Sequence, residues 1–81
     1  MIVTYWYTSG IGVKIFKNTT QAYFDEYGSY PLVDTQLPSF LNRNGYVCLP
    51  EQGHSENGIW RRGISMTEED AIVFLIRWAY D

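Results

Sequence analysis

The chain has 81 residues, a formal net charge of −3 and a single cysteine, and 17% of its residues are aromatic. This length suits one domain, so we treat residues 1–81 as a single domain. One cysteine excludes an internal disulfide framework, and the acidic balance does not favour nucleic-acid binding. No stretch approaches the roughly 20 apolar residues of a membrane span, and the first residues carry no basic leader. We therefore expect a cytoplasmic protein with no membrane association.

The first two segments are rich in β-branched and aromatic residues. Ile2–Thr8 and Ile11–Phe16 are separated by Ser9-Gly10, and a two-residue turn with glycine predicts a tight hairpin. The implied register places Trp6 on the core face. The second face is expected to carry aromatic and basic side chains: Tyr5, Tyr7 and Lys14.

A short helix is predicted next. The segment Asn18–Gln21 is typical of a helix start, because a capping Asn is followed by Gln three residues later. Gly28 is expected to end this helix, which carries Tyr23 and Tyr27. Residues 28–45 are predicted to form an ordered loop with one helical turn at Ser39–Arg43.

Two further strands are predicted, at Tyr46–Leu49 and Gly58–Ile64, and they form a second hairpin. The fold class is therefore α+β. The architecture we expect is two β-hairpins forming a four-stranded, mainly antiparallel sheet, with one short helix after the first hairpin and a C-terminal helix packed on the sheet.

The C-terminal helix has the strongest local signals. Thr67–Asp70 resembles a capping box with acidic residues in the first turn. At 100° per residue, apolar side chains cover roughly 260° of the helix circumference, whereas a sheet covers a stripe somewhat above 100° wide. The excess must contact the loop of residues 28–45 or another chain. The residues expected at an oligomer interface are Val73, Phe74, Trp78 and Tyr80.

Few side chains suggest catalysis. His54 is the only histidine, and it could act as a general base oriented by Glu56 or Asp34. The alternative is a solvated loop histidine, because its polar segment lacks the rigid support that catalysis needs. Cys48 lies between apolar neighbours in a predicted strand, which indicates a buried, inert thiol. We therefore predict no enzymatic activity, no metal and no cofactor.

The segment Trp60-Arg61-Arg62 suggests contact with another protein. Trp and Arg are enriched in binding hot spots, and in a strand Arg61 and Arg62 point to opposite faces, with Trp60 on the Arg62 side. The alternatives are one arginine in water with the other paired to a carboxylate, or a phosphate contact. The residues expected to contact a partner are Tyr5, Tyr7, Lys14, Tyr23, Tyr27, Trp60 and Arg62.

The aromatic surplus, the mild negative charge and the lack of a catalytic constellation favour a non-enzymatic protein-binding module. An inhibitor or immunity-type protein that blocks a larger enzyme or complex has this profile, as in phage anti-defence or toxin-neutralising proteins. A homo-oligomeric structural subunit, such as a homodimer assembled through the C-terminal helix, is the first alternative. A small enzyme using His54 is the second.

Overall fold

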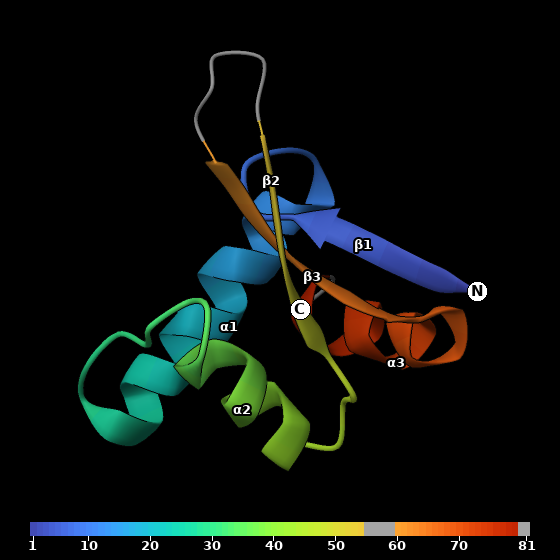
Figure 1. Ribbon diagram of the computed structural model, residues 1–81. Coiled ribbons are helices and arrows are strands. Elements are labelled where there is room, and N and C mark those ends of the chain that lie inside the picture. Colours follow the sequence, from blue (N-terminus) through green and yellow to red (C-terminus); the bar gives the residue numbers. More distant parts are fainter. Residues whose placement is uncertain (55–59, 80–81) are drawn as a thin grey trace.

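Strands and helices alternate along the chain in an α+β arrangement. The computed structural model describes residues 1–54 and 60–79, apart from the side chains of His54 and Trp60. In this part of the chain the elements are β1 (Ile2–Trp6), α1 (Ile11–Tyr27), α2 (Gln36–Arg43), β2 (Leu49–His54), β3 (Trp60–Thr67) and α3 (Glu68–Trp78) (Figure 1). None of the helices within the described ranges is long and apolar enough to cross a membrane.

The sheet has three strands in the order β1-β3-β2, and the central strand β3 is antiparallel to both neighbours. Ile64 of β3 lies opposite Tyr5 of β1 and Pro50 of β2. The predicted four-stranded sheet of two hairpins is therefore wrong, although the α+β class is correct. The antiparallel pair β2–β3 lies a few residues C-terminal to the third and fourth strands that we predicted.

The predicted second strand, residues 11–16, is the first part of α1. Buried residues recur at helical spacing at Ile15, Thr19 and Tyr23, while Val13 is 50% exposed. The hydroxyl of Thr19 donates to the carbonyl oxygen of Ile15 at 2.8 Å, so a polar residue sits in the buried stripe without an unpaired hydroxyl. The helix ends as predicted at Gly28, whose φ is 76°.

The turn between β1 and α1 brings the start of the helix against the end of the strand. Gly10 has φ 57°, a conformation that favours glycine. Gly12 lies directly on the carbonyl group of Trp6, where any Cβ atom would collide with the carbonyl oxygen. The residues that follow β1 are therefore helical and lie against its end, and β1 pairs with the distant β3.

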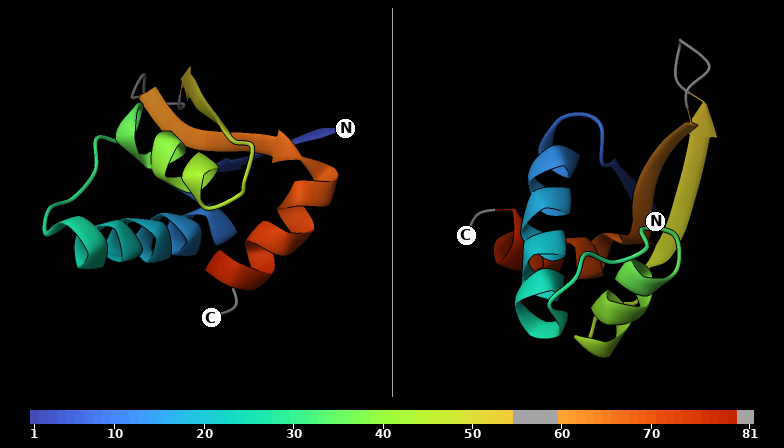
Figure 2. Two further views of the ribbon diagram at one scale, coloured as in Figure 1. Left: turned by 90° about the horizontal axis from the view of Figure 1, so that it is seen from below. Right: turned by 90° about the vertical axis from the view of Figure 1, so that its left-hand side faces the viewer.

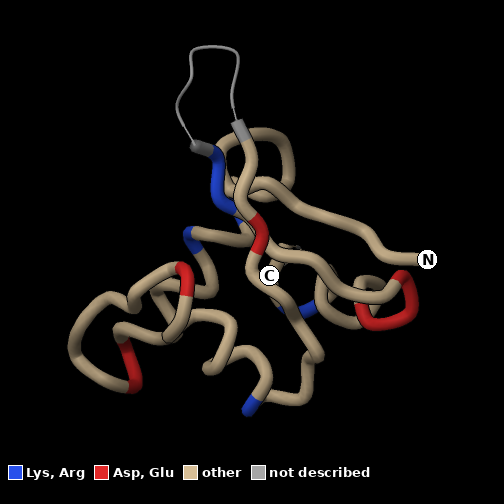
Figure 3. Tube along the Cα trace, viewed as in Figure 1, with Lys and Arg blue, Asp and Glu red and all other residues tan. Residues whose placement is uncertain are grey.

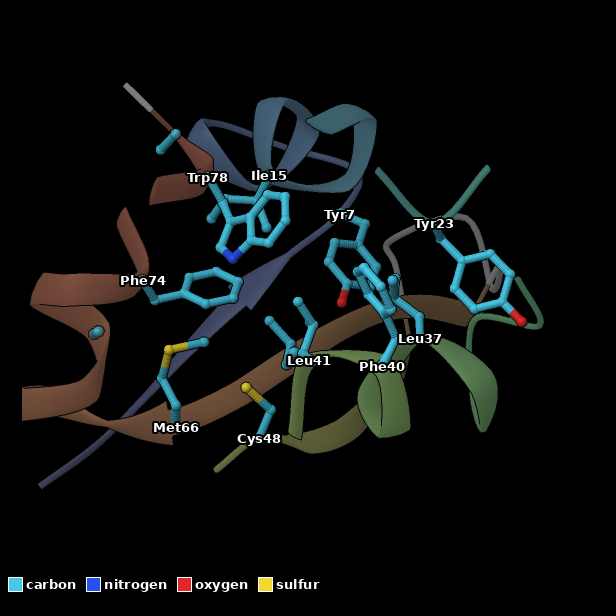
Figure 4. Close-up of a cluster of buried hydrophobic side chains, with 13 residues drawn as sticks. Tyr7, Ile15, Tyr23, Leu37, Phe40, Leu41, Cys48, Met66, Phe74 and Trp78 are labelled. Carbon is cyan, nitrogen blue, oxygen red and sulfur yellow. The ribbon is translucent and has the colours of Figure 1, made fainter. Parts of the chain in front are cut away.

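All three helices lie on one side of the sheet (Figure 2). The core fills the space between them and the sheet (Figure 4). Its fully buried side chains include Ile64 from β3, Phe74 from α3, Ile15 from α1 and Leu41 from α2. The helix α2 is longer than the single turn predicted. No described element covers the opposite face of the sheet.

The C-terminal helix begins as predicted. The Thr67 hydroxyl accepts a hydrogen bond from the backbone N–H of Asp70 at 3.2 Å, and the first turn carries three acidic residues. Ala71, Phe74 and Trp78 face the core. The sequence therefore predicts a helix start best where a capping residue is followed directly by apolar residues at helical spacing.

Candidate protein interface on the outer sheet face

The side of the sheet that faces away from the helices is open. Because side chains alternate along a strand, Ile64 and Met66 of β3 point into the core while Gly63 and Ser65 point outward. Their neighbours in register on β1 and β2 also point outward. We call this surface the outer sheet face and define it by its largest side chains: Ile2, Thr4, Trp6, Leu49, Glu51 and Arg61.

The indole of Trp6 lies flat across the outer sheet face. A Cβ atom on Gly63 would come within 2.9 Å of the ring, and one on Gly53 within 3.2 Å of its far edge. The ring therefore extends from β1 over the central strand to β2. Two glycines on adjacent strands form a seat for this ring, because any larger residue would lift it.

The guanidinium group of Arg61 covers the same ring. Its Cζ atom lies 4.5 Å from the centre of the indole, a distance suited to a cation–π contact. The Nε atom of Arg61 is buried and has no hydrogen-bond acceptor among the described residues. The charge of Arg61 is thus held by an aromatic ring and not by a described carboxylate.

Apolar and hydroxyl side chains and the carboxylate of Glu51 make up the rest of the outer sheet face. Ile2 and Leu49 are each 61% exposed. Between their strands, the Thr4 and Ser65 hydroxyl groups share a hydrogen bond of 2.7 Å, and Ser65 is only 1% exposed. Basic residues gather at the start of β3 and acidic residues at the start of α3 (Figure 3). The outer sheet face therefore offers a ring, a cation and exposed aliphatic groups on one open surface.

The structure does not gather the predicted partner-contact residues on one surface. Tyr7 and Tyr23 are buried, Tyr5 is partly buried, and Lys14 is exposed on α1 and not on a strand. Burial raises the pKa of the Tyr7 hydroxyl above its usual value. The first hairpin, which would have brought Tyr5, Tyr7 and Lys14 together, does not form.

The remaining predicted contact residues are dispersed. Tyr27 is 45% exposed on α1, with the Arg43 guanidinium 5.6 Å from its ring centre. Arg62 forms an ion pair with Asp34 at 3.0 Å, so its charge is already matched within the chain. The side chain of Trp60 lies outside the described residues.

The predicted oligomer interface is divided between the two sides of α3. Phe74 is fully buried and Trp78 is 3% exposed, so both belong to the core. Val73 lies on the opposite side and is 58% exposed. Tyr80 lies outside the described residues.

The groups considered for chemistry have little support from their surroundings. Cys48 is 2% exposed, and burial, followed by the nearby Asp70 carboxylate, raises the pKa of its thiol to about 12. The group is therefore a neutral thiol at ordinary pH. Among residues 1–54 and 60–79, no three metal-ligating side chains gather at one point. The side chain of His54 is outside the described set.

The sequence pattern does not reveal the residues that define the outer sheet face. It predicts Trp6 on the core face and Arg62, not Arg61, among the partner-contact residues. The sequence does indicate that Arg61 and Arg62 lie on opposite faces of a strand, so only one of them could share a surface with Trp6. The glycine seat under Trp6 could not be recognised, because it depends on the register of three strands.

Comparisons of the chain with protein-family models, with curated proteins and with solved structures find no match.

Proposed function

We propose that this chain is a non-enzymatic protein-binding module of the inhibitor or immunity type, which blocks a larger enzyme or complex by covering part of its surface. The outer sheet face is the contact surface. The observation that supports this most is the Trp6 ring, which is seated on two glycines and covered by Arg61 on a face that no described element shields.

The chemistry of this face resembles a binding hot spot. Trp and Arg dominate the energetics of many protein interfaces when they occupy fixed positions near the centre. Trp6 is fixed by the glycines beneath it, so little side-chain entropy remains to be lost on binding. Ile2 on β1 and Leu49 on β2 add exposed aliphatic surface on the two outer strands, which a partner would cover.

The partner surface can be specified from the same groups. Aliphatic side chains at Ile2 and Leu49 require an apolar area of comparable size. Arg61 requires a carboxylate or a carbonyl oxygen that can reach the outer nitrogens of its guanidinium group. A partner with an acidic side chain at the rim of a shallow apolar patch meets both requirements.

The test compares variants that make the same change on two different surfaces. Leu49→Arg alters the outer sheet face, and Leu32→Arg is the matched control, because Leu32 is 65% exposed on the connection between α1 and α2. Each purified variant is used as bait in an extract of the source cells, and the bound proteins are quantified by mass spectrometry. We expect a partner that the wild type and Leu32→Arg retain and that Leu49→Arg loses.

The purified partner then allows a direct measurement of affinity and inhibition. Arg61→Ala should weaken binding by about tenfold or more, which corresponds to at least about 1.4 kcal/mol, and the wild type should lower the activity of the partner. The proposal fails if no protein distinguishes Leu49→Arg from Leu32→Arg, or if the partner binds Arg61→Ala as tightly as the wild type.

A further inference from the structure

The outward side of α3 is apolar although it faces away from the core. Ile72, Val73 and Ile76 are 62%, 58% and 63% exposed, respectively. The residues that α3 buries, Ala71 and Phe74 among them, lie on the opposite side of the helix. A surface helix normally turns polar residues outward, so this side requires an explanation of its own.

Charges of opposite sign bracket this apolar side. Glu69 lies in the first turn of α3 and Arg77 in the last, and both are exposed. At 100° per residue, Glu69 lies between Ile76 and Val73 on the helix surface, and Arg77 lies next to Val73. Glu69 and Arg77 are about 12 Å apart along the helix axis. The surface therefore runs from an acidic end through three aliphatic residues to a basic end.

Two copies of this surface are complementary when their helices run antiparallel. Val73 is four residues from Glu69 and four residues from Arg77. If a second α3 packs antiparallel with Val73 at the centre, each Glu69 faces the Arg77 of the other copy, and the aliphatic residues of both helices meet between them. Contacts that repeat in this way are the mark of a twofold symmetric interface. A parallel pair would place Glu69 against Glu69, which is unfavourable.

We propose that this chain forms a twofold symmetric homodimer through an antiparallel pair of α3 helices, with Ile72, Val73 and Ile76 at the centre and two Glu69–Arg77 pairs at the ends. This contact surface is distinct from the outer sheet face, and dimerisation does not depend on the function proposed above. Within its own chain the Arg77 guanidinium group lies 4.2 Å from the centre of the ring of Trp78, a buried residue on the core side of α3, so Arg77 must turn away from this ring to pair with Glu69 of the other copy.

The size of the surface sets the expected strength. A stable interface usually buries about 800 Å² on each partner, and three aliphatic residues on an 11-residue helix supply only part of this area. The dimer should therefore be weak, with a dissociation constant on the order of 10 µM or higher. Sedimentation velocity over a series of protein concentrations should show a reversible monomer–dimer equilibrium.

Charge reversal tests the antiparallel geometry. In Glu69→Lys, the introduced lysine faces Arg77 of the other copy, and in Arg77→Glu, Glu69 faces a second glutamate, so each variant alone should dimerise about tenfold more weakly. An equimolar mixture of the two variants restores both attractive pairs in a heterodimer, because the introduced lysine faces the introduced glutamate and the native Arg77 of one chain faces the native Glu69 of the other. The double variant Glu69→Lys/Arg77→Glu restores both attractive pairs in a homodimer. The double variant should dimerise within about threefold of the wild type, and the mixture should dimerise more strongly than either variant alone.

Matched controls separate the dimer contact from general effects on charge and folding. Glu26→Lys makes the same change of charge at an exposed position of α1 and should leave dimerisation unchanged. Val73→Glu should abolish the dimer, whereas Val13→Glu, at a position 50% exposed on α1, should not. Thermal melts identify any variant that does not fold.

Three results would overturn the proposal. One is a wild-type protein that stays monomeric through the concentration series. Another is a pair of folded single charge variants that dimerise as well as the wild type. The third is a folded double variant that remains as weak as the single variants, since the antiparallel arrangement requires that it recover.

Discussion

The inner and outer faces of the sheet belong to the same three strands but are covered in different ways. The inner face carries Ile64 and Met66 and is covered by three helices. The outer face has no helix among the described residues, and the Trp6 ring lies across Gly63 and Gly53 in place of one. On the outer face, the side chain of Trp6 therefore covers part of the central strand, whereas on the inner face helices cover it.

The inner face mainly stabilises the fold, whereas the outer face is available for contact with a partner. Aliphatic groups on the inner face stabilise the fold because they leave water completely. On the outer face, Ile2 and Leu49 remain 61% exposed, so they contribute little to folding and remain available to a partner. Substitutions on the inner face should therefore mainly lower the free energy of unfolding, by a large amount. Substitutions of exposed residues on the outer face should change stability less and mainly affect partner binding.

The largest effect is expected for Ile64→Ala on the inner face. Ile64 is fully buried among side chains from the strands and helices, and truncating such a residue leaves a cavity and costs about 2–5 kcal/mol. Urea denaturation should measure this loss in the free energy of unfolding. A loss below about 1 kcal/mol would mean that the inner face is not the tightly packed side of the sheet.

Gly63→Ala tests the seat on the outer face and should have the next largest effect. The added methyl group would meet the Tyr5 carbonyl oxygen and come within 2.9 Å of the Trp6 ring. We expect a loss of about 1–3 kcal/mol together with a change in tryptophan fluorescence. Gly53→Ala is the control and should have a smaller effect, because it meets only the far edge of the ring at 3.2 Å.

The pH dependence of stability should come from the inner side, where Cys48 is buried. The pKa of its thiol rises from the ordinary value of 9.0 to about 12 in the folded protein. As pH rises through 9.0 the unfolded chain loses the thiol proton while the folded chain keeps it, so stability falls with rising pH from about one unit below this value and is unaffected at lower pH.

Urea denaturation across the pKa of the unfolded thiol, from about pH 8 to about pH 10, measures this slope. The pKa of Tyr7 is also raised, but its effect is centred about one unit higher, at its ordinary value of 10.0, and contributes less between about pH 9 and about pH 10. Cys48→Ala should therefore lose most of the slope between about pH 9 and about pH 10. An unchanged slope in this variant would show that another group is responsible.

Local signals in the sequence predicted α3 correctly, but they predicted a second strand where α1 begins, for a physical reason. The cap at Thr67 and the helical period after it lie within a few residues of one another. Residues 11–16 alternate like a strand over a short distance, and the longer helical period runs through Thr19, which is a polar residue in the sequence. Its hydroxyl bonds to the backbone of its own helix, so it can be buried.

The candidate surfaces differ in the same way. The apolar excess of α3 was visible in the sequence, because a helix fixes the angle between its own residues. The Trp6 seat depends on Gly63 and Gly53, which lie on two other strands. Such a contact is set by strand register, and register depends on pairing between distant segments.

The smallest predicted effect compares two adjacent arginines on opposite faces of β3. Arg61 lies on the Trp6 ring, and Arg62 pairs with Asp34 through side chains that are 53% and 40% exposed. Arg61→Ala and Arg62→Ala should each cost about 0.5–1 kcal/mol or less at low salt. High salt should remove the effect of Arg62→Ala, because it screens an exposed ion pair.

The effect of Arg61→Ala should persist at high salt, because Arg61 also covers the indole with its apolar surface. Thermal melts of both variants at low and high salt measure the difference. If the two effects decline equally with salt, the Arg61–Trp6 contact is an ordinary exposed charge interaction. The outer sheet face would then lack the fixed ring and cation that distinguish it from the rest of the surface.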